Sequence, residues 1–325
     1  MTQHPSAHST YTGVALVIGS ALSLQFGAVF AYQLFPQLGS WGVTTLRLGV
    51  AALVLTLMVR PKVGQWSAEQ WKAVALFGGS MALMNGTFYA AIERIPIGLA
   101  VTIEFLGPLV LAAALSRRGI DFLWLGIALL GMGVLGYESI NNATDYDPLG
   151  VLFALIAGLG WALYVLAGAK VGQAVEGTGG LAVAMSFAAV FLLPLGAPGA
   201  LKGVTDPHLL LLAIGTGLLA SLIPYTLELM ALRRLPRNTF SILLSLEPAV
   251  AAIAGFLLLG QVTGPVRWLA IVLLIAASVG VTLSARKNPG PQEVQLGEVA
   301  PVTASLPMIE DATAQGSKPQ RAEKG

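Results

Sequence analysis

Long apolar segments separated by short polar connections make up most of this chain. A helix needs about 20 mostly apolar residues to cross the hydrocarbon core of a bilayer, and ten segments approach or reach that length. The pattern therefore predicts an all-α integral membrane protein with ten transmembrane helices. The expected spans are Gly13–Gln33, Gly42–Val59, Ala73–Ile92, Ile97–Leu115, Phe122–Tyr137, Leu149–Ala169, Gly180–Leu195, His208–Leu232, Asn238–Leu259 and Trp268–Leu283.

The connections between these segments are rich in proline and glycine, which end helices, as at Pro36–Gly39 and Gly264–Pro265. They are too short to hold a soluble domain. Residues 1–12 are polar and contain no Lys or Arg, unlike a secretory signal, so we expect a cytoplasmic tail before an uncleaved first helix. Residues 288–325 turn abruptly to Pro, Gly, Gln, Glu and Ala, which predicts a disordered cytoplasmic tail.

Composition supports a membrane location and argues against an enzyme. Hydrophobic residues make up 55% of the chain and charged residues only 10%, whereas soluble domains hold about 25% charged residues. The net charge of +2 gives no reason to expect nucleic acid, and the absence of cysteine excludes thiolate metal sites. No phosphate-binding Gly-x-x-x-x-Gly-Lys motif occurs, and every aspartate is expected in a loop or tail. We expect no cofactor, no metal and no catalysis, only lipid and a small-molecule substrate as partners.

The distribution of basic residues predicts the orientation, because cytoplasmic loops carry an excess of Lys and Arg. If both termini are cytoplasmic, 14 of the 18 basic residues lie inside and three outside, and Arg47 lies within a span. We therefore expect a multi-pass protein of the cell membrane with both termini in the cytoplasm.

Two halves of the chain resemble each other at a shift of 140 residues. This shift aligns Ala91–Pro96 with Ala231–Pro236 and Pro108 with Pro248. Five spans fall in each half, residues 13–137 and 149–284, and an odd number of spans places the second half upside down relative to the first. Such inverted repeats are typical of secondary transporters. Chance similarity between apolar helices is the alternative.

Glu104 and Glu247 lie seven to nine residues into their spans, about 10–14 Å deep at 1.5 Å per residue. A charge at that depth costs about 2.5–3.5 kcal/mol or more and requires a reason. Each acid stands close to a proline, which can free a backbone carbonyl to face a cavity. We favour a substrate or proton site; two protonated acids that hydrogen-bond for helix packing are the alternative.

Two further charges fall within spans. Arg47 either extends to the outer interface or binds a substrate carboxylate with two hydrogen bonds. Glu228 lies near Arg233 and Arg234, and an ion pair at the cytoplasmic interface is the favoured interpretation.

Neutral polar and aromatic candidates complete the set. The shift of 140 residues places Asn85 and Tyr225 at one level, and Gln25 also lies within a span. Trp161 and Tyr164 are spaced i, i+3 and share a helix face, which suits either an ammonium group or an interfacial position in lipid.

Several motifs resemble the EamA-type branch of the drug/metabolite transporter superfamily, and more closely its bacterial threonine/homoserine exporters. They are Leu34-Phe-Pro36, Gly42-Val-Thr-Thr-Leu-Arg-Leu48, Glu104-Phe-Leu-Gly-Pro108, Ser116-Arg-Arg118, Pro224-Tyr-Thr-Leu-Glu228, Arg234-Leu-Pro236, Ser245-Leu-Glu-Pro-Ala249 and Ala276-Ala-Ser278.

The resemblance covers residues 13–287 and implies export of small amino acids in exchange for protons. Arg47 would hold the carboxylate of a zwitterion, and Glu104 or Glu247 would hold its ammonium group. Export of another metabolite or drug by the same fold, an uncoupled channel and a membrane-embedded enzyme are the alternatives.

Overall fold

The computed structural model describes residues 7–95, 97–141, 147–250, 253 and 264–287. The expected tail 288–325, half of the expected tail 1–12 and the end of the expected span Asn238–Leu259 lie outside the described residues. All regular structure within the described ranges is helical. The elements are α1 (Ala7–Val59), η1 (Val63–Gln65), α2 (Ala68–Ile92), α3 (Ile97–Glu104), α4 (Leu106–Leu115), α5 (Gly119–Asn141), α6 (Pro148–Ala174), α7 (Gly179–Thr205), α8 (Pro207–Gly217), η2 (Leu218–Leu222), α9 (Ile223–Leu232), α10 (Arg237–Leu243) and α12 (Pro265–Lys287), with 246–250 also helical.

Within the described residues, six helical spans are long and apolar enough to cross a membrane, and two shorter apolar helices accompany them. Large apolar side chains on their outer faces are exposed, among them Met58 at 73% and Leu211 at 68%. In water such a surface would favour aggregation, whereas lipid tails accommodate it. The chain is therefore a multi-pass membrane protein, as its composition predicts.

The first predicted turn is wrong. The chain remains helical through Pro36, and the two segments of α1 meet instead at Gly39. Gly39 has φ of 65°, a conformation that favours glycine because a side chain would clash with the backbone. Both segments of α1 can therefore span the membrane without an intervening loop.

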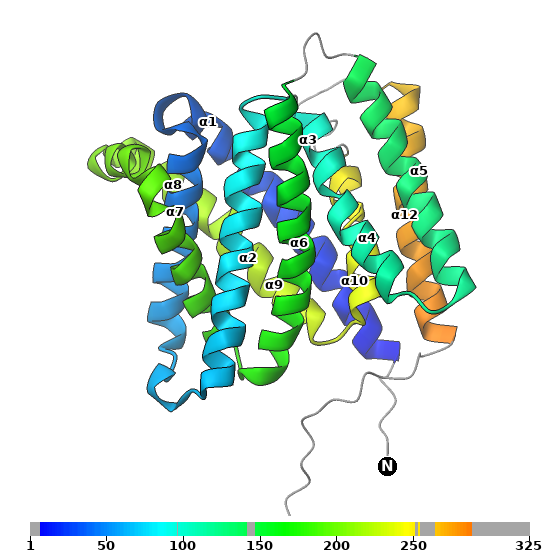
Figure 1. Ribbon diagram of the computed structural model, residues 1–325, viewed down its shortest axis with the longest axis horizontal. Helices are drawn as coiled ribbons and strands as arrows, with labels where there is room; N and C mark the ends of the chain where they lie inside the picture. The colour runs from blue at the N-terminus through cyan, green and yellow to red at the C-terminus, as the bar shows by residue number, and fades with distance from the viewer. Residues whose placement is uncertain (1–6, 96, 142–146, 251–252, 254–263, 288–325) are drawn as a thin grey trace, which may run out of the picture. The chain divides into compact units, whose positions relative to one another are not determined.

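The helices pack side by side, with α2 next to α6 in the middle of the view (Figure 1). α1 packs against α7, α8, η2 and α9; α2 packs against α6 and α7; and α3 and α4 both pack against α6. α5 and α12 pair with each other, and α10 contacts α4. Phe77, Tyr164, Met81 and Leu181 are fully buried at the centre. Segments distant in sequence thus meet around the middle of α6.

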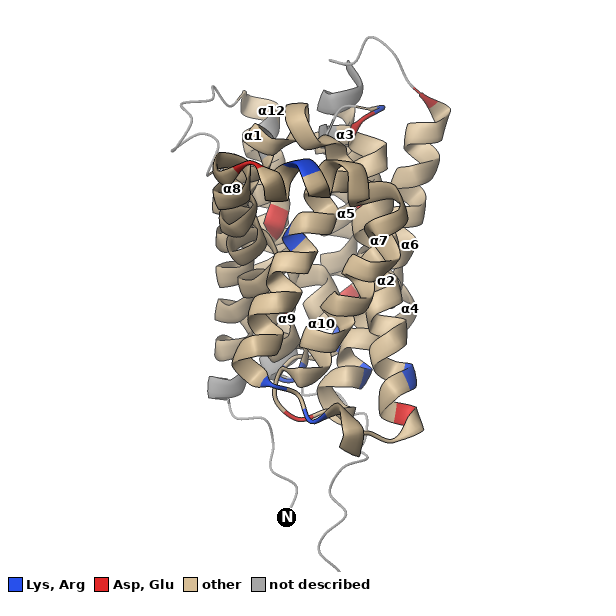
Figure 2. Ribbon diagram, turned by 90° about the vertical axis from the view of Figure 1, so that its left-hand side faces the viewer, with Lys and Arg blue, Asp and Glu red and all other residues tan. Residues whose placement is uncertain are grey.

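Charged residues gather at the ends of the helices, and Lys and Arg predominate at the end where α1 begins (Figure 2). The helix ends also carry capping residues, including the reciprocal Ser67–Gln70 pair before α2 and Asp147 before α6. These side chains satisfy the unpaired backbone N–H groups of a first helical turn.

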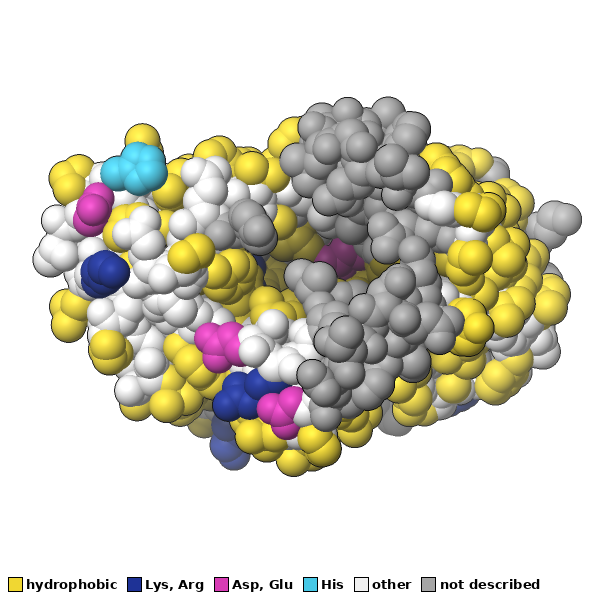
Figure 3. Space-filling view, turned by 90° about the horizontal axis from the view of Figure 1, so that it is seen from above, with side chains coloured by type: hydrophobic (Ala, Val, Ile, Leu, Met, Phe, Trp, Pro, Cys, Tyr) yellow, Lys and Arg dark blue, Asp and Glu magenta, His cyan; other side chains and the backbone are white. Residues whose placement is uncertain are grey.

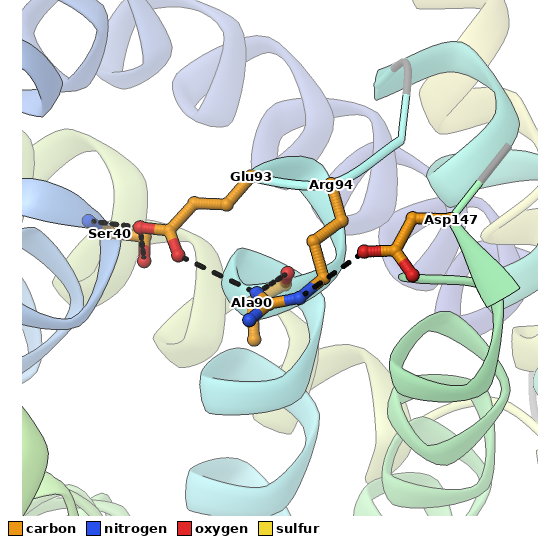
Figure 4. A network of polar contacts seen from close by, with 5 residues as sticks. All are labelled: Ser40, Ala90, Glu93, Arg94 and Asp147. Carbon is orange, nitrogen blue, oxygen red and sulfur yellow. Dashed lines mark hydrogen bonds and ion pairs between the residues drawn. The ribbon is translucent and has the colours of Figure 1, made fainter. Parts of the chain in front are cut away.

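At the opposite end, a polar network ties α1, α2 and α6 together (Figure 4). The Ser40 hydroxyl and backbone N–H both donate to Glu93, and the Arg94 guanidinium lies 3.9 Å from Glu93 and 3.6 Å from Asp147. Arg94 also donates to the carbonyl of Ala90. Ser40 directly follows the break at Gly39, so this network holds the bent part of α1 against both neighbours.

Candidate substrate-binding site

Two interrupted helices form one side of the site. The single span expected over Ile97–Leu115 is divided into α3 and α4 by a break at Phe105. A second break, at Leu244–Ser245, separates α10 from the helical residues 246–250. Phe105 and Ser245 stand 140 positions apart, the same shift that relates the two halves of the sequence. Interrupted helices are a common source of binding groups in transporters.

Proline helps to explain both interruptions. Pro108 and Pro248 each follow three residues after the break and supply no N–H to the residue four positions earlier. The carbonyls that lose a helical donor in this way belong to Glu104 and Leu244, and that of Leu244 accepts from the backbone N–H of Glu247 instead, at 2.9 Å. A proline in the local sequence therefore favours each interruption.

Glu104 and Glu247 lie beside these breaks. Glu104 is the last residue of α3 and only 7% exposed, while Glu247 is half-buried at the start of the helical stretch that follows the second break. The two carboxyl groups are close enough to interact electrostatically with each other and with Arg47. The structure therefore brings together the three charges that we expected to act on a substrate.

Close contact with α6 positions the first break. A Cβ on Gly107 would collide with the backbone of Gly158, and a Cβ on Gly158 would lie 2.7 Å from the carbonyl oxygen of Glu104. The ring of Phe105 meets that of Trp161 edge-on at 4.5 Å between centroids. Two glycines and one aromatic pair thus hold Glu104 against α6.

Arg47 lies in the interior, and the interfacial alternative is wrong. Its side chain is 4% exposed and donates hydrogen bonds to the carbonyl of Ala220, at 2.8 Å, and to the Asn85 amide oxygen. The guanidinium also lies 5.1 Å from the ring centroid of Tyr89. Its Nε has no hydrogen-bond partner among the described residues. A buried donor left without a partner is rare in proteins and suits a ligand.

A π-helical turn provides the partner of Arg47. η2 interrupts the expected span His208–Leu232, and Pro224 follows it without an N–H to donate to Ala220 or Leu219. These two carbonyls accept hydrogen bonds from elsewhere: Arg47 donates to Ala220, and Ser23 donates to Leu219 at 2.7 Å. Side chains of α1 therefore stabilise an irregular turn that a regular helix would not require.

Asn85 and Tyr225, which the shift of 140 residues pairs, are in direct contact. The Tyr225 hydroxyl donates to the Asn85 amide oxygen at 2.9 Å, and the Asn85 amide nitrogen donates to the carbonyl of Met81 at 2.8 Å. The prediction that both present a polar group at one level is confirmed. Through Asn85, Tyr225 is also connected to Arg47.

The expected interfacial ion pair of Glu228 is wrong. Glu228 is 8% exposed and accepts hydrogen bonds from Ser20, at 2.7 Å, and from Tyr164, at 2.8 Å. Arg233 is directed instead to the end of α6, where it donates to the carbonyls of Gly172, Val175 and Gly177. Arg234 donates to the carbonyl of Met230. Glu228 therefore belongs to the interior.

Trp161 and Tyr164 are buried, so the interfacial alternative is wrong for them as well. Tyr164 is fully enclosed, stacks on Phe77 at 5.1 Å and lies 5.6 Å from the ring of Tyr225. Gln25 is half-buried on α1 and forms none of the hydrogen bonds described for this cluster. The contacts described above thus involve eight of the nine candidates, and Gln25 takes part in none of them.

Three members of the site could not be found from the sequence. Ser20 and Tyr89 are ordinary residues of apolar spans, and η2 has no motif of its own. Pro224 was the one available signal, since a proline within an apolar span marks a carbonyl in need of another donor.

The arrangement suits a small ligand with charges of both signs. Seen from the end at which α2 ends and α6 begins, the molecule is hollowed near its middle, and an acidic side chain is visible in the depression (Figure 3). The described residues hold no cluster of three or more His, Asp or Glu side chains that could bind a metal ion. A guanidinium on one side and two carboxylates nearby can bind an anionic and a cationic group of one molecule.

Comparison with known proteins identifies the family. Residues 148–283 match the model of the EamA-like transporter family. The chain is 37% identical over 283 residues to the threonine/homoserine exporter RhtA of Escherichia coli strain K12, covering 87% of this chain and 95% of that protein. This chain belongs to the EamA-like transporter family. It is a transporter and not an enzyme.

Further relatives and one solved structure are similar to this chain. RhtA of Salmonella typhimurium strain LT2 is 38% identical over 274 residues, 84% of this chain and 92% of that one. The uncharacterized transporter YwfM of Bacillus subtilis strain 168 is 26% identical over 258 residues, 77% of this chain and 86% of that one. A crystal structure with 16% identity has a TM-score of 0.67 and covers 85% of this chain and 98% of its own, which shows a shared fold.

Proposed function

We propose that this EamA-type transporter exports threonine, homoserine or similar small amino acids across the cytoplasmic membrane in exchange for protons. The observation that carries the proposal is the juxtaposition of Arg47, with its unpaired Nε, and the carboxyl groups of Glu104 and Glu247. An amino acid carries one carboxylate and one ammonium group, which these residues match in charge. The names of the RhtA relatives support the same substrates.

In this proposal Arg47 binds the substrate carboxylate through Nε and its remaining N–H donors, and Asn85 and Ala220 hold the guanidinium in place. Glu104 and Glu247 share the ammonium group. Ionised acids at membrane depth are costly, so a proton that enters from outside compensates for the positive charge of the departing ammonium group. Antiport follows because the proton and the substrate each neutralise negative charge among the interior acids.

The fold that we propose for this activity has ten spans in two inverted halves, residues 13–137 and 149–284. The matching breaks at Phe105 and Ser245 and the Asn85–Tyr225 contact at a separation of 140 residues support it. Two equivalent halves of opposite orientation can exchange conformations and thereby expose one site to each side in turn.

Efflux from preloaded cells tests the function. Cells that express the chain should lose threonine and homoserine faster than cells without it, and a proton uncoupler should abolish the difference. The Glu104→Gln and Glu247→Gln variants should lose export, whereas Glu69→Gln, the same change at an exposed end of α2, should not. Normal export by both interior variants would refute the mechanism. No acceleration by well-expressed wild-type protein would refute the choice of substrates.

A further inference from the structure

Glu228 is held in a manner that differs from the other interior charges. Its two carboxyl oxygens accept hydrogen bonds from hydroxyl groups of two other helices, Ser20 on α1 at 2.7 Å and Tyr164 on α6 at 2.8 Å. All three side chains are buried. Ion pairs in the described part of the chain join Arg94 to Glu93 and Asp147, and Lys170 to Glu69, all at helix ends. Glu228 thus depends on neutral partners.

We propose that Glu228, Ser20 and Tyr164 form the proton-carrying site of this transporter, separate from the Arg47–Glu104–Glu247 cluster that binds the amino acid. A hydroxyl group both donates and accepts hydrogen bonds. When Glu228 takes up a proton, one of the two hydroxyls can rotate and accept the new O–H, so both oxygens of the carboxyl group keep a partner in either protonation state. A guanidinium lacks this freedom because it only donates.

The two sites are close enough to influence each other. Glu228 interacts electrostatically with Glu247, and the ring of Tyr164 lies 5.6 Å from that of Tyr225, which bonds to Asn85. The titratable groups that face Glu228 are Tyr164 on α6, Tyr225 on α9 and Glu247 after α10, while α1 contributes the uncharged Ser20. Of the described cations, Arg47 interacts electrostatically with Glu247 and Tyr225, so its charge also acts on this group.

This contact gives the sign of coupling that an antiporter needs. Protonation of Glu228 removes a negative charge that attracts the substrate ammonium group, so it favours substrate release. Bound ammonium in turn disfavours a proton on Glu228, because coupling between two sites is reciprocal. Proton and substrate therefore exclude each other although they occupy different residues. This inference rests on the proposed function as a proton-coupled exporter.

Reconstituted vesicles can separate the two sites. Glu228→Gln keeps the size of the side chain and can still bond to both hydroxyl groups, accepting through its oxygen and donating through its nitrogen, but it cannot take up a proton. We expect it to exchange labelled threonine for unlabelled threonine at a rate within about twofold of wild type, and to lose all accumulation driven by a pH gradient. Glu104→Gln should lose both activities, and Glu69→Gln neither. Glu228→Asp, which keeps the titratable group, should regain part of the driven accumulation.

Two results would overturn the proposal: accumulation by Glu228→Gln at the wild-type level, or loss of exchange as complete as in Glu104→Gln. Infrared difference spectra across a pH jump provide a readout that does not require a substrate. Wild-type protein should show a carbonyl band from a protonated carboxyl group that is missing in Glu228→Gln; an unchanged band would refute the proposal. If wild-type protein carries no threonine but the band behaves as expected, the choice of substrate fails and the proton site stands.

Discussion

The hydrogen bonds of Arg47 divide its guanidinium into a structural part and an available part. Two donors hold the carbonyl of Ala220 and the amide of Asn85, and both partners belong to other helices. Nε and the remaining N–H groups are left for a ligand. Arginine suits this division because it presents five donors in a rigid plane, whereas lysine is a single flexible point charge.

Arg47→Lys should therefore fail even though it keeps the charge. The ammonium group of the new lysine cannot bond to Ala220 and Asn85 and also donate two parallel hydrogen bonds to a substrate carboxylate. A hydrogen bond to a charged group is worth about 1.5–3 kcal/mol, so substrate affinity should fall about ten- to hundredfold. The concentration dependence of threonine efflux measures the loss. The control is Arg117→Lys, at an exposed site outside the cluster. Unchanged affinity of Arg47→Lys for threonine would show that the guanidinium of Arg47 does not bind the substrate.

At the scale of single residues, the sequence predicts how deep a charged residue lies within its span, but not which side chains it contacts. Glu104, Glu247 and Arg47 stand out because charge in lipid is costly. The partners of Glu228 depend instead on the relative rotation of α1, α6 and α9, which no single span encodes. For that reason a nearby pair of arginines was a misleading guide, and Ser20 was missed.

At the scale of elements, irregular helices carry the polar groups. Ala220 lies in η2, and Glu104 ends α3. Apolar length predicts that a span exists but not that it is interrupted, so the breaks at Phe105 and Ser245 and the π turn were not foreseen. The prolines at 108, 224 and 248 mark all three once their missing N–H groups are considered.

Pro224→Ala should restore the missing N–H and favour a regular helix through η2. The carbonyl of Ala220 would then gain a helical donor and release Arg47. Removing a proline from a helix interior relieves up to about 3 kcal/mol, so we expect higher thermal stability in detergent together with loss of export. Pro194→Ala in α7, at an exposed position, should raise stability without affecting export. Full export by Pro224→Ala would show that the π turn is dispensable.

Gly107→Ala tests the packing of the first break. The added Cβ would meet the backbone of Gly158, which cannot rotate away as a side chain can. Overpacking of this kind costs about 1–3 kcal/mol, so the melting temperature in detergent should fall. Gly126→Ala on α5 is the matched control, since its Cβ would meet no atom within 4 Å. Equal stability of the two variants would mean that α4 and α6 separate easily at this point.

At the scale of the whole molecule, the relation between the halves was the most informative feature of the sequence. The shift of 140 residues, read from Ala91–Pro96 and Ala231–Pro236, also relates Asn85 to Tyr225 and one helix break to the other. A chance similarity of two apolar segments would not be expected to extend to both. Polar contacts at the two opposite ends follow the same relation. Arg94, just after α2, pairs with Asp147 before α6, and Arg233, just after α9, bonds to the end of α6.

The proposed inversion of the two halves and the excess of basic residues near the start of α1 together predict which loops face the cytoplasm. The chain allows a direct test because it contains no cysteine. A single cysteine at Glu176, between α6 and α7, should be protected from a membrane-impermeant thiol reagent in intact cells. A cysteine at His208, at the start of α8, should be labelled, since one span separates the two sites; both positions are exposed.

Permeabilised cells, in which both cysteines should react with the reagent, control for accessibility. The reverse pattern would place both termini outside and make the hollow at the end where α2 ends and α6 begins the cytoplasmic entrance (Figure 3). Labelling at both positions in intact cells would contradict a membrane-spanning α7, and with it the five-plus-five division of the chain.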